Sequence, residues 1–437
     1  MSKYSNSTEL LAPAGSFEKL KYALEFGADA VYAGLPDFSL RARINKFDKK
    51  NIIEAINYTH HRNKKIYITI NIFVHNYHLK NLEKHLRDLK NNPPDAFIIS
   101  DIGVLEMTKK ILPKVKIHLS TQANTTNWQA VKAWRKMGVE RIVLARELSL
   151  EEIREIHRKV PELEFEYFVH GAMCMAYSGR CLLSAWQTGR SSNLGDCAQN
   201  CRWKYQLVEE KRPNEYIPIE QDQHGSYLLN SKDLCLIEYL SELKNVGITS
   251  FKIEGRAKSV YYLSQVVKTY RQTLGIKAND KNKKTKIREL KKDVGKLLNR
   301  TFTTGFLFGE CKHKGQKTKF SHIKEKYMFV GEVIKLESKK LKVGSKTKKT
   351  SLVKIKVHNA IFAGDRIEFI QPRGDNFFCK IKNIYECETL KKLESAHGGQ
   401  ERTVCLEVNK TPEVFSILRK KIKSKINSGI AQSKNKC

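Results

Sequence analysis

Residues 165–174 read FEYFVHGAMC, and this stretch, with the segment that follows it, decides how the chain is interpreted. A mainly apolar run ends at His170, which is followed by glycine and by a segment that is polar, aromatic and glycine-rich. Half of the ten cysteines of the chain fall there. They are Cys174, Cys181, Cys197, Cys201 and Cys235. We therefore expect a metal centre at this place, at the mouth of a β/α barrel.

The spacing of these cysteines is C-x6-C, then 15 residues, C-x3-C, then 33 residues and the last cysteine. It differs from the paired C-x2-C pattern of zinc ribbons. Four thiolates suit either zinc or an iron–sulfur cluster, and the spacing alone leaves both metals open. Because there are five cysteines for four places, one of them is expected to be a spare core thiol.

The charge of the chain points to a polyanionic partner. The sequence has 80 Lys and Arg against 46 Asp and Glu, a net charge of +34. An excess of this size favours nucleic acid or an anionic surface, although a general bias towards lysine contributes to it. No apolar run reaches the roughly 18 residues of a membrane span, and the first residues lack a signal-peptide core. We expect a cytoplasmic protein without a membrane partner, whose cysteines are metal ligands or core residues rather than disulfides.

Short apolar runs alternate with amphipathic stretches from residue 9 to about 275, which predicts a parallel sheet covered by helices. Eight runs are rich in Ile, Val, Phe or Tyr and lack internal proline. They are Glu9–Ala12, Ala30–Gly34, Lys65–Asn71, Asp95–Ser100, Lys116–Gln122, Arg141–Arg146, Glu164–Val169 and Ser250–Glu254. Eight strands close a barrel of the TIM type, whereas the alternative doubly wound sheet would carry GxGxxG after its first strand. No such motif follows Leu11, so we predict the barrel.

Polar residues stand where these strands end, at the face of a barrel that carries the chemistry. Gln122, His170, Glu254 and Arg256 are the main candidates for the site. For Gln122 and for Asp101, helix capping or a loop hydrogen bond is about as probable as substrate contact. Arg300, further along the chain, suits either an anion ligand or an ion pair.

The rest of the chain divides by composition. We predict a barrel over residues 1–275 with a cluster-binding insertion at about 171–235, and a Lys-rich helical connector over 276–325. Short alternating strands with glycine turns then indicate a small β-barrel or sandwich over 326–412, and 413–437 form a basic tail.

Several motifs are similar to those of the U32 collagenase-like peptidase family. They are the run from Glu166 to Cys174, Ser178-Gly179-Arg180-Cys181, Cys197-Ala198-Gln199-Asn200-Cys201-Arg202, Leu10 to Gly15, Asn230 to Cys235 and Phe251 to Arg256. The resemblance covers essentially the whole chain, including the C-terminal β domain. In length and in its single barrel the chain resembles the branch that hydroxylates tRNA uridine-34, rather than the longer rRNA cytidine hydroxylases.

The resemblance implies a [4Fe–4S] cluster and oxygen-independent hydroxylation of uridine at C5, with prephenate as the oxygen donor. It implies Cys174, Cys181, Cys197 and Cys235 as ligands, with Cys201 as the alternative to one of them. The implied partner is the anticodon loop of tRNA, and a second subunit, identical or paralogous, is left open. The other interpretations are 23S rRNA cytidine hydroxylation, a non-catalytic metal-stapled RNA-binding protein, and a peptidase. No GxSxG or HExxH motif supports the last.

Roles for further residues follow from their chemistry. Arg180, Arg202 and Arg256 suit carboxylates or phosphates, because a guanidinium group binds them through two hydrogen bonds; each suits an ion pair equally well. His170 either transfers a proton or fixes the cysteine loop by a hydrogen bond to a main-chain carbonyl. Tyr177 either stacks on a base or packs within the loop. Glu254 and Gln122 complete the expected substrate site.

Overall fold

The computed structural model describes residues 8–39, 45–173, 180–203, 207–209, 212–217, 221–222, 225–226, 231–309, 326–343 and 346–422. Cys174 and Tyr177 lie outside these ranges, and so does the side chain of Arg202. The chain forms two compact units, Met1–Ile323 and Lys324–Cys437.

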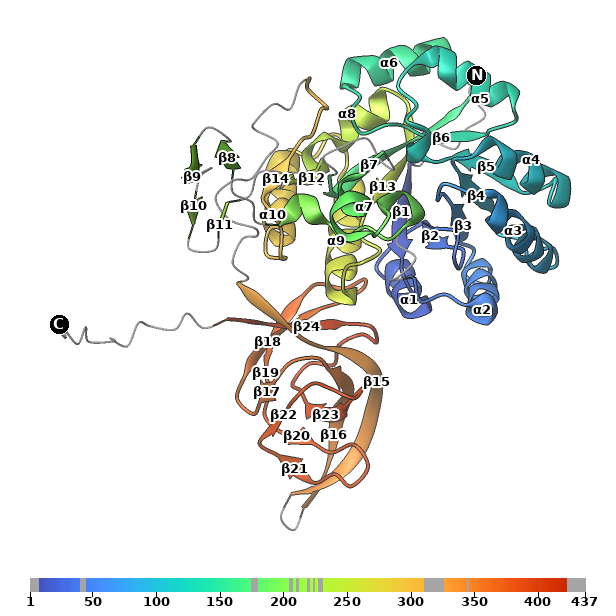
Figure 1. The fold of residues 1–437 in the computed structure, drawn as a ribbon. Helices are drawn as coiled ribbons and strands as arrows, with labels where there is room; N and C mark the ends of the chain where they lie inside the picture. Colours follow the sequence, from blue (N-terminus) through green and yellow to red (C-terminus); the bar gives the residue numbers. More distant parts are fainter. Residues whose placement is uncertain are drawn as a thin grey trace. The chain divides into compact units, whose positions relative to one another are not determined.

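Eight parallel strands form a closed barrel in the first unit (Figure 1). They are β1 (Glu9–Ala14), β2 (Ala30–Gly34), β3 (Lys65–Ile70), β4 (Ala96–Ile99), β5 (Lys116–Leu119), β6 (Arg141–Val143), β7 (Glu164–Ala172) and β13 (Ile248–Ile253). Each strand pairs with the next, and β13 pairs with both β7 and β1, which closes the ring. The predicted TIM-like barrel is confirmed, and the doubly wound sheet is excluded.

Helices follow the strands and surround the barrel (Figure 1). They are α1 (Phe17–Glu25), α2 (Lys49–His60), α3 (Asn76–Asp88), α4 (Ile102–Ile111), α5 (Trp128–Lys136), α6 (Leu150–Lys159) and α9 (Val260–Leu274). Most begin at a side chain that accepts a hydrogen bond from a first-turn N–H group, as Ser149 does from Glu152. Asp101 caps α4 in this way, accepting from the Val104 N–H group, so capping is the role that the structure gives it.

The chain leaves the barrel between β7 and β13, where the sequence predicted an insertion. The elements there are α7 (Leu183–Thr188), η3 (Ser192–Leu194), η4 (Asn200–Arg202), β8 (Leu207–Glu209), β9 (Arg212–Ile217), β10 (Gln221–Asp222), β11 (Gly225–Ser226), β12 (Asp233–Cys235), η5 (Ile237–Tyr239) and α8 (Leu240–Asn245). Strand β12 matters most, because it pairs antiparallel with the end of β7 and places Cys235 opposite His170. It thereby extends the barrel sheet beside the predicted site.

The residues predicted as a separate connector belong to the first unit up to Ile323. Helix α10 (Lys283–Val294) contacts α9, and β14 (Phe302–Thr303) pairs with β12. The helix that was predicted within the connector is present, and it buries Ile287 and Val294.

The second unit is all β, as predicted. Its strands are β15 (Tyr327–Val343), β16 (Lys346–Val357), β17 (Ile361–Phe362), β18 (Arg366–Ile370), β19 (Phe377–Lys380), β20 (Ile384–Tyr385), β21 (Lys392–Leu393), β22 (Ser395–Ala396), β23 (Thr403–Glu407) and β24 (Ile417–Lys421). Eight of them form an antiparallel sheet in the order β19-β18-β24-β15-β16-β23-β20-β21. Alternating apolar side chains such as Val353 and Ile355 supply its core.

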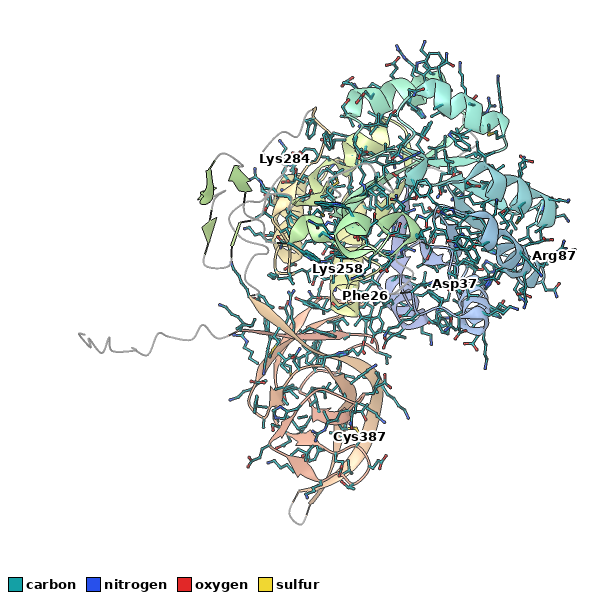
Figure 2. All side chains as sticks on the ribbon, viewed as in Figure 1. Phe26, Asp37, Arg87, Lys258, Lys284 and Cys387 are labelled. Carbon is teal, nitrogen blue, oxygen red and sulfur yellow. A yellow bond between two sulfur atoms is a disulfide. The ribbon has the colours of Figure 1, made fainter. Side chains whose placement is uncertain are left out.

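Two features of this unit differ from expectation. Strand β24 lies inside the sheet, between β18 and β15. The predicted start of the basic tail at residue 413 is therefore wrong, because residues 417–421 belong to the sheet. Ile417 and Leu418 are fully buried, and these two apolar residues outweigh the lysines that suggested a tail. Cys387, labelled in Figure 2, forms a disulfide with Cys405, whereas the sequence favoured reduced cysteines.

Among the described residues, no helix combines the length and the apolar character that crossing a membrane requires.

Candidate functional site

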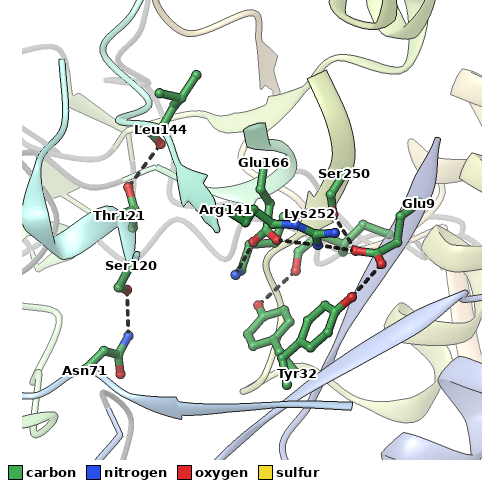
Figure 3. Close-up of polar contacts among 12 residues, drawn as sticks. Glu9, Tyr32, Asn71, Ser120, Thr121, Arg141, Leu144, Glu166, Ser250 and Lys252 are labelled. Atoms are coloured by element: carbon green, nitrogen blue, oxygen red, sulfur yellow. Dashed lines mark hydrogen bonds and ion pairs between the residues drawn. The ribbon is translucent and has the colours of Figure 1, made fainter. Parts of the chain in front are cut away.

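A network of charged side chains lies inside the barrel (Figure 3). The Arg141 guanidinium group on β6 lies 2.6 Å from Glu9 of β1, 2.5 Å from Glu164 and 3.4 Å from Glu166, both of β7. The ammonium group of Lys252 on β13 lies 2.5 Å from the other oxygen of Glu166. Four strands of the barrel are thus joined by charge-assisted hydrogen bonds.

Neutral donors complete the network. The Tyr67 hydroxyl donates to Glu9 over 2.6 Å, and the Ser250 hydroxyl donates to the other oxygen of Glu9 over 2.8 Å. Burial alone would raise the pKa of Glu9, but Arg141 and these hydrogen bonds lower it below its usual value. Burial lowers the pKa of Lys252, and Glu166 opposes this shift. The network keeps charged groups paired in a place where unpaired charges would be costly.

Cationic and aromatic side chains lie next to this network, towards the ends of the strands. The Lys252 ammonium group lies 4.5 Å from the ring centre of Tyr32, and the Arg256 guanidinium carbon lies 5.8 Å from it. Arg256 is buried, and its Nη1 lies 3.3 Å from the Thr69 hydroxyl. The Tyr32 hydroxyl donates to the main-chain oxygen of Ile253 over 2.9 Å. The predicted site residue Arg256 thus contacts side chains of β2 and β3.

Gln122 takes part in a separate polar group. The Asn71 amide at the end of β3 donates to the Gln122 side-chain oxygen over 3.0 Å, and the Ser120 hydroxyl at the end of β5 contacts the same oxygen. Asn71 also lies 3.4 Å from that hydroxyl (Figure 3). Gln122 thus makes the loop hydrogen bond that the sequence allowed, and its contact with substrate stays a prediction. Asn71 and Ser120 are buried, and the hydrogen bonds among Asn71, Ser120 and Gln122 join the ends of β3 and β5.

A second cluster surrounds His170 at the end of β7. His170 Nδ1 lies 3.2 Å from the hydroxyl of Tyr270 on α9, and that hydroxyl donates to the Val169 main-chain oxygen over 2.8 Å. The Cys235 sulfur lies 3.8 Å from the same hydroxyl. Burial lowers the pKa of His170 to about 4, so its ring is neutral at pH 7. Burial raises the pKa of the Cys235 thiol.

The backbone around His170 is tightly fitted. Gly171 has φ +112°, and a Cβ atom placed on it would lie 2.5 Å from the Glu254 main-chain oxygen. The Glu254 N–H group donates to the His170 oxygen over 2.8 Å. This main-chain contact joins the end of β7 to the residue that follows β13, and it leaves no room for a side chain at position 171. The close approach explains why glycine stands directly after His170.

A buried ion pair supports the same region. Arg300 donates to Asp233 of β12 through its main-chain N–H group over 3.0 Å and through Nη2 over 2.6 Å. Burial alone would raise the pKa of Asp233, but the pairing with Arg300 lowers it. Of the two roles that the sequence left open for Arg300, the structure shows the ion pair. It anchors β12, and with it Cys235, to the segment that leads into β14.

The remaining described cysteines of the insertion are half-buried thiols. The Cys181 N–H group lies 3.4 Å from the Asn193 side-chain oxygen, and the Ser192 hydroxyl donates to the Cys181 oxygen over 2.6 Å. The Gln199 N–H group lies 3.4 Å from the Cys197 sulfur, and Cys201 lies in η4. Within the described ranges, no three Cys, His, Asp or Glu side chains are grouped closely enough to hold a metal ion. Cys174 falls outside those ranges, so the complete ligand set stays a prediction.

The donor chemistry of these side chains nevertheless suits a cluster. None of these four described cysteines forms a disulfide: they are the half-buried Cys181, Cys197 and Cys201 and the buried Cys235. Thiolates are the usual ligands of iron–sulfur clusters, and the segment that carries them begins at the end of a barrel strand.

The predicted site residues therefore fall into three places. His170, Glu254 and Cys235 meet at the ends of β7, β12 and β13, whereas Arg256 and Gln122 both contact the end of β3. Arg180 is exposed, with its guanidinium carbon 5.5 Å from the ring centre of Phe73, while Cys174, Tyr177 and the Arg202 side chain lie outside the described residues.

Sequence reasoning missed the network around Arg141 and the contacts of Tyr270. The one available signal was Glu166, a charged residue inside an otherwise apolar strand. A buried carboxylate needs a partner, and its partners come from β6 and β13.

Comparison with known proteins agrees with the two units. The family "Peptidase family U32" matches residues 15–317, and "Peptidase family U32 C-terminal domain" matches residues 325–419. The "tRNA hydroxylation protein P" of Escherichia coli (strain K12) is 37% identical over 89% of this chain and 90% of its own length.

Two further relatives show how far the similarity extends. The "tRNA hydroxylation protein P1" of Bacillus subtilis (strain 168) is 38% identical over 89% of each chain. The "23S rRNA 5-hydroxycytidine C2501 synthase" of Escherichia coli (strain K12) is 38% identical over 63% of this chain and 40% of its own length. With both parts of the family matched in order, the chain belongs to peptidase family U32.

Proposed function

We propose that this protein is a tRNA-modifying hydroxylase that adds a hydroxyl group to C5 of uridine-34. The observation that carries the proposal is similarity along nearly the full length to relatives named for tRNA hydroxylation. The rRNA cytidine hydroxylase is matched over only 40% of its length, which favours tRNA over rRNA as the substrate. The net charge of +34 supports a nucleic-acid substrate of either kind.

We infer that a [4Fe–4S] cluster is bound by Cys174, Cys181, Cys197 and Cys235, with Cys201 as the alternative to one of them. Such a cluster supplies redox chemistry that amino-acid side chains do not carry. Tyr270 contacts both His170 and Cys235, and it would hold the two in a fixed relation. The neutral His170 ring suits this positioning role at pH 7.

The oxygen donor is proposed to be prephenate, a small dicarboxylate. Arg256 is the described cation at the mouth that best suits one of its carboxylates, because a guanidinium group binds a carboxylate through two hydrogen bonds. Lys252 lies near it, and both cations lie against the ring of Tyr32.

A peptidase function gains little support from the described residues. The Cys235 thiol is buried, and the side-chain contact that the structure shows for it is the Tyr270 hydroxyl rather than a basic group. A nucleophilic thiol needs a base within hydrogen-bond reach. His170 is neutral and is held by the same tyrosine.

The test is nucleoside mass spectrometry of tRNA and rRNA from a strain that lacks the gene, complemented with variants. Wild type should restore 5-hydroxyuridine in tRNA, and Cys235→Ser should not, while Cys379→Ser in the second unit serves as a thiol control that retains activity. Anaerobically purified wild type should contain iron and sulfide, and the Cys235 variant should lose them. A colourless protein that binds RNA, with unchanged tRNA and rRNA nucleosides, would favour the non-catalytic alternative.

A further inference from the structure

Large apolar side chains are exposed beside the cysteine segment. Trp186 is 78% exposed and Leu182 is 73% exposed, and the two lie one turn apart because the Trp186 N–H group donates to the Leu182 oxygen. Tyr77, in the first turn of α3, is 71% exposed, and Phe73, in the loop that precedes this helix, is 39% exposed. We call Phe73, Tyr77, Leu182 and Trp186 the aromatic rim.

The two segments of the rim are joined by defined contacts. The Phe73 N–H group donates to the Asn193 main-chain oxygen over 3.1 Å, and the Arg180 guanidinium carbon lies 5.5 Å from the Phe73 ring centre. Asn193 in turn contacts the Cys181 N–H group. The loop after β3 and the cysteine segment therefore form one surface at the C-terminal ends of the barrel strands.

The fold attaches one side of α7 and leaves the other exposed. Ser184 accepts a hydrogen bond from the Ala198 N–H group, and Gln187 accepts one from the Asn200 amide. These contacts fix the helix to the residues around Cys197 and Cys201, so its opposite side presents Leu182 and Trp186 to solvent. Exposed apolar side chains grouped beside a site indicate a binding surface, because their exposure to water is unfavourable.

The composition of the rim favours nucleic-acid bases over another protein surface. Tyr77 lies beside two imidazole rings, 5.5 Å from His75 and 4.0 Å from His78, measured between ring centres. Arg180 is exposed, and among the described residues no ion pair is assigned to it. Proteins bind unpaired bases by stacking them on planar rings, and they bind the adjoining phosphates with cations. The net positive charge of the whole chain is also complementary to RNA.

We propose that the aromatic rim binds the unpaired bases of an RNA loop by stacking, with Arg180 on the adjoining phosphates. The inference rests on the proposed function, because it names how the substrate of that reaction is held. Trp186 is the central residue, since it is the most exposed of the large apolar side chains that the structure describes. Duplex RNA offers no free base faces, so the rim would distinguish a loop from a helix.

The experiment compares two variants of the full-length protein at one position. Trp186→Phe keeps a planar ring, and Trp186→Leu keeps an apolar side chain without one. Fluorescence anisotropy measures the affinity for an anticodon-type hairpin and for a blunt duplex of the same length, at one salt concentration. Wild type and Trp186→Phe should prefer the hairpin, and Trp186→Leu should bind it about 5- to 150-fold more weakly, the range for losing one stacked base, with the duplex unchanged.

Three results would overturn the proposal. They are equal affinity of wild type for hairpin and duplex, hairpin binding by Trp186→Leu at the wild-type level, and a change of oligomeric state in Trp186→Leu by light scattering. The last would show that the rim is an interface between copies of the chain. If wild type makes no hydroxylated nucleoside but still prefers the hairpin, the proposed function fails and the rim proposal stands, so the two failures are distinguishable.

Discussion

Replacing Arg141 by methionine removes the cation that three carboxylates share. The guanidinium group pairs with Glu9, Glu164 and Glu166 within 2.5–3.4 Å, and its side chain is only 6% exposed. Methionine preserves much of the volume without the charge. Because Glu166 keeps Lys252 as a partner, the carboxylate that loses most is Glu9. Removing one partner of a buried pair typically costs about 3–5 kcal/mol.

Protonation of Glu9 sets an upper limit to that cost. A glutamic acid with the ordinary pKa of 4.5 takes up a proton at pH 7 for about 3.4 kcal/mol, at about 1.4 kcal/mol for each pH unit. We therefore expect the free energy of unfolding to fall by about 3 kcal/mol at pH 7. At pH 5 the same protonation costs about 0.7 kcal/mol, so the loss should shrink to less than about 1 kcal/mol.

The sign of this pH dependence follows from the pKa of Glu9. In wild type that pKa is lowered, so the stability it contributes is present above pH 4.5 and is lost as the pH falls through the folded-state pKa. Without Arg141, burial would raise the pKa of Glu9, and the variant would gain relative stability as the pH falls. As the pH falls, wild type loses stability and the variant gains relative stability, so the difference between their free energies of unfolding becomes smaller.

Urea unfolding followed by tryptophan fluorescence measures the effect. All four tryptophans, Trp128, Trp134, Trp186 and Trp203, lie in the first unit, so the signal reports that unit alone. The control is Arg87→Met on α3 (Figure 2), where the exposed Arg87–Glu83 pair should contribute no more than about 0.5 kcal/mol. Equal losses in the two variants, or a loss at Arg141 that is the same at pH 5 and pH 7, would refute the reasoning.

Three further predictions use the same preparation. Gly171→Ala should cost about 1–3 kcal/mol by fluorescence-monitored unfolding, because its Cβ atom would lie 2.5 Å from the Glu254 oxygen, whereas Gly189→Ala, with open space around it, should cost about 1 kcal/mol. Asp233→Asn should lower the free energy of unfolding by about 3–5 kcal/mol at pH 7, because the Arg300 charge stays buried without its counter-charge; an effect as small as that of Arg87→Met would contradict this. The affinity for tRNA, measured in filter-binding assays, should fall steeply as the salt concentration rises, and an affinity that does not depend on salt would contradict the proposal that the protein binds RNA.

The barrel could be predicted because its strands are local signals. Each is a short run of branched or aromatic residues, and the parallel pairing follows from the helices between them. The charged interior gave no comparable signal. Glu9 and Arg141 are 132 residues apart, and each stands at the start of its strand, where a charged residue usually faces water. Only the closed ring brings them together.

Parts of the candidate site could likewise be predicted from the sequence, and other parts could not. The sequence identified the cysteine segment and His170, because several cysteines in an otherwise polar loop are uncommon. It did not predict that Cys235 pairs with His170, since β12 has only three residues and is too short to stand out. Tyr270 lies within a helix that buries apolar, aromatic and polar side chains alike, so nothing in the sequence marks its hydroxyl contacts, which depend on the tertiary fold.

The charged interior and the mouth are coupled through Tyr32. Its ring lies against both Lys252 and Arg256, and its hydroxyl donates to Ile253, which lies between them in sequence. Lys252 is itself held by Glu166, and Glu166 by Arg141. A change in the interior therefore reaches the guanidinium group at the mouth through three side chains in direct contact, and substitutions in contact are not additive. Because stability and the proposed substrate binding share these residues, a loss of activity in an interior variant shows a catalytic role only when the unfolding free energy has been measured beside it.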